Sequence, residues 1–401
     1  MSFENPANII RSWNLQSNFA TGPVLQDKLV PPVFGRIRTN FITTWREEKL
    51  DSRLNWESPS FSVYLPESLR VIGSIYLKVD LPANSGGAAY KKYPALYVIK
   101  TLRLLSGGQE VYSCDVQTML GDYCQSLSEE QLKVFGETYL GHQAAGMDDG
   151  ARSVMIPVLL PNSAYGSRNG HDTRGHGVFP AYLGNNRLEL QFTTNEAKHL
   201  SSDASNVPGS IASACYMMYH EVKMTSFNMK QYQDQRAKYS IVNRRFTELT
   251  SGWVEYATAN AVEVVRHSQP QGTITEVQII AVADFSDDES RATFQYILPT
   301  SIRCTADARV QRDLDSKQKV EIELWQNGFV PNDDFPAPGR MCFANHAAEA
   351  AHTYSGGYNM TLASNVDFQF TFAQACRYKI FAVQLQRIKI DPVGRLASYL
   401  E

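Results

Sequence analysis

The sequence predicts an all-β protein built from two antiparallel β-sandwich domains in tandem. Within Leu69–Leu81 every second residue is apolar or Gly, which is the period of a strand with one buried face. Ser106-Gly107-Gly108 can supply the positive φ angles that a tight hairpin between two strands requires. The chain has 401 residues, which is too long for one ordinary sandwich and suits two domains of similar size.

The first half of the chain predicts a series of strands interrupted by helical sequence. Val116, Met119, Leu120 and Tyr123 recur every three or four residues, and Ser128-Glu-Glu-Gln131 has the pattern of a capping box that opens a second short helix. The predicted strands are Phe61–Leu65, Leu69–Leu81, Tyr97–Leu105, Gln109–Ser113, Ser153–Leu160, Arg187–Thr193 and Ala214–Thr225.

A polar, Gln-rich segment without Gly or Pro, residues 226–238, predicts a short helix between the two domains. We therefore expect an N-terminal arm at residues 1–54, a first sandwich at 55–225, this linker helix, and a second sandwich at 239–401. The strongest strands of the second half are predicted at Ile274–Phe285, Val320–Gln326, Val366–Thr371 and Tyr378–Ile390.

The charge pattern argues against direct contact with nucleic acid. The formal net charge is −3, and no segment carries a dense run of Lys or Arg. A surface that neutralises many phosphates would show a basic stripe. There is also no uninterrupted apolar run of membrane-spanning length, so no integral membrane segment is expected.

Residues that could carry chemistry do not form a convincing site. The loop Gly170–His176 offers two imidazoles and a carboxylate, but its glycines favour a solvated or interface loop over a preformed metal site. The six cysteines have no metal-binding spacing and are expected to be reduced and mostly buried. Nucleotide-binding and hydrolase motifs are absent. We therefore expect no catalytic, cofactor-binding or metal site, and no enzyme activity.

Several motifs occur in the order seen in one protein family. Ser58–Pro66 followed by Val71–Pro82 is similar to the opening strand pair of that family, and Ile99–Val111 is similar to its Gly-Gly hairpin. Met155–Pro161 and Val178–Tyr182 are similar to the series that closes its first roll. The chain thus resembles the double jelly-roll major capsid proteins of tailless icosahedral double-stranded DNA viruses, of the nucleocytoplasmic large DNA virus type and the PRD1-adenovirus lineage.

This resemblance covers most of residues 55–225 and is weaker in the second half. There, Met360–Phe372 and Ile380–Leu396 are similar to the last strands of the family, but its Pro-Ser-Gly-x-x-Asn-Phe-Ser signature is not evident. The resemblance implies two tandem eight-stranded antiparallel jelly rolls with short helices in the connecting loops.

The resemblance also implies a structural role in the capsid shell of a virion that is assembled inside an infected host cell. The subunit would form pseudo-hexagonal homotrimeric capsomers that tile the icosahedral shell over an internal membrane. Its partners would be itself, neighbouring capsomers, minor capsid or penton proteins, and the membrane or its proteins through the N-terminal arm. No cofactor and no direct nucleic-acid contact are implied.

Large subunit interfaces favour aromatic and Arg side chains, and two long, turn-rich loops, residues 161–181 and 327–358, carry both. These loops could equally be ordinary exposed loops. The expected trimer contacts are Tyr165, Arg168, Arg174, Phe329 and Phe335, and the expected contacts of the N-terminal arm are Trp13, Arg36 and Trp45.

Two other functions remain open for jelly-roll sequences. A carbohydrate-binding or receptor-binding virion protein would expose a platform of Trp or Tyr side chains on one sandwich. An enzyme of the cupin type would bring two His and a carboxylate together inside one roll. A minor or penton capsid protein is a closer variant, but pentons usually need only one roll, and two predicted sandwiches favour the hexagonal capsomer.

Overall fold

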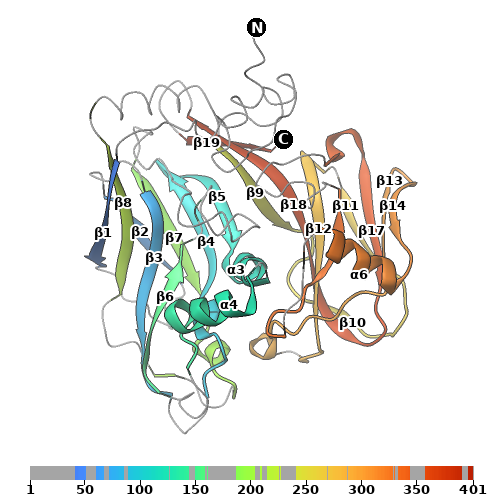
Figure 1. The fold of residues 1–401 in the computed structure, drawn as a ribbon. Coiled ribbons are helices and arrows are strands. Elements are labelled where there is room, and N and C mark those ends of the chain that lie inside the picture. The colour runs from blue at the N-terminus through green and yellow to red at the C-terminus, as the bar shows by residue number, and fades with distance from the viewer. Residues whose placement is uncertain are drawn as a thin grey trace. The chain divides into compact units, whose positions relative to one another are not determined.

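The computed structural model describes the chain from residue 41 to residue 400 with gaps. The described residues are 41–50, 60–66, 72–84, 89–125, 127–143, 150–158, 160, 187–203, 208–209, 215–224, 226, 241–268, 270–286, 288–327, 329, 333–343, 357–390 and 396–400. The chain divides into two compact units, one of Met1–Val242 with Ile388–Ser398 and one of Asn243–Arg387 with Tyr399–Glu401. Each unit contains two antiparallel sheets (Figure 1).

The first unit has the strand order of a jelly roll. One sheet has the order β1-β8-β3-β6 and the other β2-β7-β4-β5, so the chain changes sheets at every connection except the β4–β5 hairpin. The strands are β1 (Phe41–Lys49), β2 (Ser60–Tyr64), β3 (Ile72–Leu81), β4 (Ile99–Ser106), β5 (Gln109–Asp115), β6 (Arg152–Pro157), β7 (Leu188–Thr194) and β8 (Tyr216–Met224). The seven strands predicted for this half are confirmed as β2 to β8.

β1 corrects the predicted N-terminal arm, because it lies inside residues 1–54 and yet belongs to the first sheet. It pairs with β8 along its whole length, from Phe41↔Met224 to Lys49↔Tyr216. The strand was missed because it lies at a sheet edge and its residues from Trp45 to Lys49 are exposed, so they show no apolar alternation.

The Gly-Gly hairpin is confirmed. Ser106 of β4 pairs with Gln109 of β5, and the two residues between them, Gly107 and Gly108, have φ angles of 58° and 82°. Positive φ at both central positions is the geometry of a type I′ turn, whose twist matches that of the strands it joins.

The helical excursion after β5 is also confirmed. It comprises α3 (Val116–Gln125), α4 (Glu129–Phe135) and the π-helical turn η3 (Gly136–Leu140). Ser128 and Gln131 form the predicted capping box, in which each side chain accepts a hydrogen bond from the backbone N–H of the other. The short 3-10 helices of this unit are η2 (Pro94–Tyr97) and η5 (Ala197–Leu200).

The second unit repeats this topology. One of its sheets has the order β11-β17-β13-β14, and the other has the order β10-β18-β12-β15 with β16, β9 and β19 added. The strands are β9 (Ile241–Glu248), β10 (Val254–Tyr256), β11 (Glu263–Ser268), β12 (Thr273–Val282), β13 (Ser301–Ala306), β14 (Arg309–Leu314), β15 (Gly339–Cys342), β16 (Tyr358–Asn359), β17 (Asn365–Thr371), β18 (Cys376–Ile390) and β19 (Leu396–Leu400). The helices are η6 (Glu289–Arg291), α6 (Lys317–Gln326) and η7 (Met360–Leu362).

The two units also match in the position of a helix: α6 follows β14 in the second unit, as α3 follows β5 in the first. Three predicted strands of this half, at Ile274–Phe285, Val366–Thr371 and Tyr378–Ile390, are confirmed as β12, β17 and β18. The predicted linker helix lies outside the described residues except for Ser226.

The fourth predicted strand of this half, Val320–Gln326, is wrong, because these residues belong to helix α6. The helix begins after Ser316, whose side chain accepts a hydrogen bond from the backbone N–H of Lys319. Val320 and Leu324, four residues apart, face inward, whereas Ile322 is exposed. A short stretch with Val, Ile and Leu at every second position fits a strand, but the same stretch also contains this helical pair.

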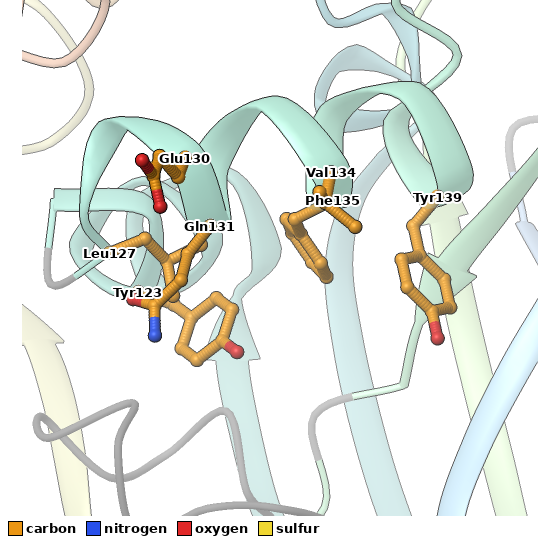
Figure 2. Close-up of a pocket in the computed structure, with 7 residues that line it drawn as sticks. All are labelled: Tyr123, Leu127, Glu130, Gln131, Val134, Phe135 and Tyr139. Atoms are coloured by element: carbon orange, nitrogen blue, oxygen red, sulfur yellow. The ribbon is translucent and has the colours of Figure 1, made fainter.

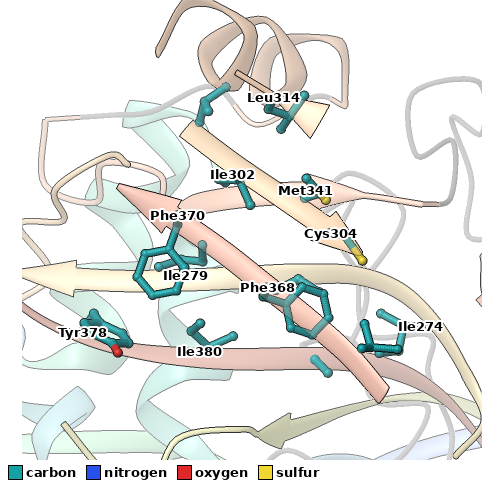
Figure 3. Packing of buried hydrophobic residues seen from close by; sticks show 14 of the residues in the cluster. Ile274, Ile279, Ile302, Cys304, Leu314, Met341, Phe368, Phe370, Tyr378 and Ile380 are labelled. Atoms are coloured by element: carbon teal, nitrogen blue, oxygen red, sulfur yellow. The ribbon is translucent and has the colours of Figure 1, made fainter. Parts of the chain in front are cut away.

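The core of the second unit lies between its two sheets (Figure 3). Phe368 and Phe370 of β17 pack against Ile279 of β12 and Ile380 of β18, and all four side chains are almost completely inaccessible to water. Apolar side chains from both sheets therefore fill one continuous interior, as a jelly roll requires.

Candidate assembly surfaces

Five of the eight side chains predicted to make subunit contacts lie outside the described residues. These are Tyr165, Arg168, Arg174, Trp13 and Arg36. Trp45 is described: it lies on edge strand β1, is 55 % exposed, and has its ring centroid 5.8 Å from that of Tyr76 on β3.

Phe329 and Phe335 do not have the surface position that was expected of trimer contacts. Both are buried within the second unit, with exposed fractions of 5 % and 0 %. The guanidinium of Arg340 lies 3.8 Å from the ring centroid of Phe329, and the ring of Phe335 packs 5.0 Å from that of Phe294. These two side chains therefore pack within the second unit and have little surface to offer a neighbouring subunit.

Large apolar side chains that do reach the surface identify other candidates. Contiguous exposed apolar groups on a soluble protein often mark sites of interaction. Among the described residues the exposed members are Trp45, Tyr64, Val134, Val262, Val264, Val310, Ile322 and Trp325.

Two of these side chains lie on the outer face of α6. Ile322 is 52 % exposed and Trp325 is 75 % exposed, and a spacing of three residues places them on one side of the helix. We refer to Ile322 and Trp325 as the α6 ridge. The alternating Val320, Ile322 and Leu324 predicted a strand for this segment, and a strand has no such ridge.

The opposite face of α6 is fixed to the roll by Glu323. Its buried carboxylate accepts hydrogen bonds from Nη2 of Arg312 on β14, at 2.6 and 2.8 Å, and from the backbone N–H of Cys342 on β15, at 2.8 Å. One side chain thus ties the helix to a strand of each sheet, and the α6 ridge projects from a rigid support.

The helical excursion of the first unit carries a hollow of about 440 Å³, shown in Figure 2. Gln131, Phe135 and Tyr139 follow one another at intervals of four residues and therefore share one helical face. The ring centroid of Phe135 lies 5.3 Å from that of Tyr123 and 5.2 Å from that of Tyr139. The residues that line this α4 groove are Tyr123, Leu127, Glu130, Gln131, Val134, Phe135 and Tyr139.

The helical excursion that carries the α4 groove is acidic, although only Glu130 of its exposed glutamates lines the groove. Glu129, Glu130 and Glu137 are exposed, and Lys133 is the single cation between Ser128 and Leu140. No ion pair within the described part of the chain involves any of the three glutamates. The lining of the groove thus combines aromatic and aliphatic side chains with the carboxylate of Glu130 and the amide of Gln131.

The described residues offer little for catalysis. No three His, Cys, Asp or Glu side chains among them come close enough together to hold a metal ion. All six cysteines are buried thiols, and burial raises the pKa of Cys114, Cys304 and Cys376 to about 12. Such thiols stay protonated near neutral pH and are poor nucleophiles. In the ranges that the structure covers, no helix is both long and apolar enough to cross a membrane.

Comparison with solved structures identifies the fold of the chain. No protein-family model matches the sequence, and no curated protein is similar to it. Among solved structures, the PBCV-1 virus capsid matches 91 % of this chain and 97 % of its own, with a TM-score of 0.64 and 13 % identity. The chain has the double jelly-roll fold of viral major capsid proteins.

Two further structures share this double jelly-roll fold. The Faustovirus major capsid protein matches 93 % of this chain and 95 % of its own, with a TM-score of 0.61 and 8 % identity. The mavirus major capsid protein matches 89 % and 90 %, with a TM-score of 0.58 and 11 % identity. The double jelly-roll similarity therefore spans both units, as the family resemblance in the sequence implied.

Proposed function

We propose that the protein is a viral major capsid protein, a structural subunit of the virion shell without enzymatic activity. The observation that carries the proposal is the repeated topology. Two rolls have the same strand order, each with a helix after its β5 or β14 strand, over a chain that matches capsid proteins along nearly its whole length.

The proposed assembly unit is a homotrimer. Three copies supply six rolls of one topology, which is the number that a pseudo-hexagonal outline needs, and a closed ring of identical subunits is a common form of oligomer. Such capsomers would tile an icosahedral shell over an internal membrane. Neighbouring capsomers, minor capsid or penton proteins, and the internal membrane or its proteins are the proposed partners. The membrane or its proteins would be contacted through the N-terminal arm.

Mass measurement and negative-stain imaging of the purified full-length protein test this proposal. We expect a stable particle of three times 45.0 kDa with a hexagonal outline. A protein that stays monomeric at all accessible concentrations would contradict the proposal. A dimer or monomer that binds to a glycan array would favour the carbohydrate-binding alternative.

Tyr165, Arg168 and Arg174 remain proposed trimer contacts, and Trp13, Arg36 and Trp45 remain proposed contacts of the N-terminal segment. Arg174→Ala is expected to lower the yield of trimer. Phe335→Ala does not test the trimer contacts, because the side chain of Phe335 is fully buried and its loss would disturb folding.

A further inference from the structure

The two units share one hairpin that corresponds residue by residue. β4 and β5 are joined by a two-residue turn at residues 107–108, and β13 and β14 by one at residues 307–308, with positive φ at all four positions. Both hairpins also change register at the same place, directly after Leu104 in the first unit and directly after Cys304 in the second. The strands of the two units can therefore be compared position by position.

The neighbouring strands β7 and β17 extend this correspondence, because Leu104 pairs with Leu190 and Cys304 with Phe368. β4 and β7 are the central strands of one sheet, and β13 and β17 are those of the other. We call their outward-facing positions the repeated face. It consists of Thr101, Arg103, Leu105, Glu189, Gln191 and Thr193 in the first unit, and in the same order of Ser301, Arg303, Thr305, Asp367, Gln369 and Thr371 in the second.

The repeated face has nearly the same chemistry in both units. Its Arg, its Gln and one Thr are identical, and the pairs Thr101/Ser301 and Glu189/Asp367 carry the same functional groups. The inward-facing positions of the same strands share only one identical residue, Phe192/Phe370, because the other pairs are Leu102/Ile302, Leu104/Cys304, Ser106/Ala306, Leu188/Val366 and Leu190/Phe368. Outward-facing side chains generally tolerate substitution better than core side chains. The folding of each roll therefore does not explain why its surface recurs more closely than its core.

Ion pairs within each sheet do not explain the repeat either. Arg103 pairs with Glu110, whereas Arg303 pairs with Asp313. These two acids do not occupy corresponding positions, since the first-unit residue that corresponds to Asp313 is Ser113. The arginine is thus present in both units although its acidic partner lies in a different place in each.

We propose that the repeated faces are the surfaces through which neighbouring capsomers meet, each packing against a repeated face of another copy of this chain. The inference rests on the proposed function, since it adds the contact that joins trimers to one another. A hexagonal outline has six sides, whereas a homotrimer supplies each unit only three times. Six like neighbours can pack around it when both units offer the same chemistry at the sides.

The repeated face is also complementary to itself. Each copy of the face carries one guanidinium and one carboxylate, together with amide and hydroxyl groups that both donate and accept hydrogen bonds. Two such faces that run in opposite directions can place the arginine of each opposite the acid of the other. A nucleic acid or a strongly charged membrane would instead favour a surface with charge of one sign. The mixed charge therefore favours a second copy as the occupant.

The two arginines are accessible to such a partner. The side chains of Arg103 and Arg303 are 51 % and 46 % exposed, and their acids in the same sheet are themselves about one third exposed. Exposed ion pairs of this kind contribute little stability. Each guanidinium can therefore exchange or share its acid with that of another copy at little cost.

The association of trimers into larger assemblies measures the contribution of both faces. Gln191→Lys and Gln369→Lys place a charge at corresponding points of the two faces, on side chains that point outward from the sheet. Each variant is expected to raise the trimer concentration at half-association about tenfold in sedimentation velocity, and both to a similar extent. Gln295→Lys is the matched control, because Gln295 is exposed and lies outside both sheets, and it should leave association unchanged. Thermal unfolding at low concentration checks that each variant folds.

Site-specific photocrosslinking identifies the occupant. The full-length protein is made with benzoylphenylalanine in place of Gln191 or, separately, of Gln369, and is irradiated both as dilute trimers and after further association. We expect both positions to crosslink two copies of the chain in the associated sample alone, with the second attachment point on a repeated face. A crosslink to another surface, crosslinking in the dilute trimers, or a product from only one of the two positions would overturn the inference.

These results separate the inference from the proposed function. If the native trimers do not associate further at any accessible concentration, or if either lysine variant associates like the native protein, the proposed contact is refuted while the trimeric capsomer stands. If the native protein forms no trimer at all, the proposed function itself fails.

Discussion

Arg340 of β15 and Glu276 of β12 form an ion pair in which both side chains are fully buried in the second unit. Nη1 of Arg340 lies 2.9 Å from Oε1 of Glu276, and Nε2 of Gln278 donates to the same oxygen at 2.6 Å. The pair joins neighbouring strands inside a low-dielectric interior, where removing one charge leaves the other poorly solvated.

Glu276→Gln is therefore expected to destabilise the folded protein by about 3 kcal/mol or more, because the buried guanidinium loses its acidic partner. Denaturant unfolding of the native and variant proteins gives the difference. The double variant Glu276→Leu with Arg340→Met should recover most of the loss, since an apolar pair needs no charge compensation. A single variant as stable as the native protein would show that the pair does not carry this role.

His267 on β11 makes the stability of the fold depend on pH. Burial lowers the pKa of its imidazole below the ordinary value of 6.5. The unfolded chain then takes up the proton before the folded chain does as the pH falls. The contribution of His267 is fully present above pH 6.5 and is lost as the pH falls through the lowered pKa.

His267→Gln is expected to reduce the loss of stability between about pH 7.5 and about pH 5.5, because glutamine does not titrate. Denaturant unfolding of both proteins at the two pH values measures it. Equal losses in the two proteins would show that other groups account for the acid sensitivity.

At the scale of single elements, the turn of the β4–β5 hairpin needs glycine at position 108 because of its backbone conformation and not because of close neighbouring atoms. Gly108 has a φ of 82°, and a Cβ added there would meet no atom within 4 Å. Gly108→Ala should therefore destabilise the protein by about 1 kcal/mol through the left-handed backbone alone. Gly209→Ala is the matched control, because its site is equally open and its φ lies outside the left-handed region. Equal melting temperatures for the two variants would contradict this reasoning.

The elements also show which predictions local sequence supports. The hairpin and the capping box were predicted correctly because each is specified by a few adjacent residues with defined backbone requirements. α6 was predicted wrongly because Val320, Ile322 and Leu324 fit a strand, and only packing against β14 and β15 selects the helical pair Val320 and Leu324. β1 was missed because its exposed edge position leaves no apolar period.

At the scale of the whole molecule, assembly and stability are coupled if the subunit works as a trimer. Association that favours the folded chain raises its stability by mass action. The melting temperature of the full-length protein is therefore expected to rise with protein concentration over a hundredfold dilution series, as differential scanning fluorimetry can measure. A melting temperature independent of concentration would indicate that the folded subunit gains nothing from assembly in this range.

The sequence by itself determined the fold class, most strands, the position of the Gly-Gly hairpin and the helical excursion, because these follow from local periodicity and turn chemistry. Only the tertiary structure decided which side chains face outward. It buried Phe329 and Phe335, which composition had suggested as contacts, and exposed Trp325 and the α4 groove, which no motif had indicated. Exposure depends on how distant strands and helices pack around each side chain, and a pattern along one segment does not contain that information.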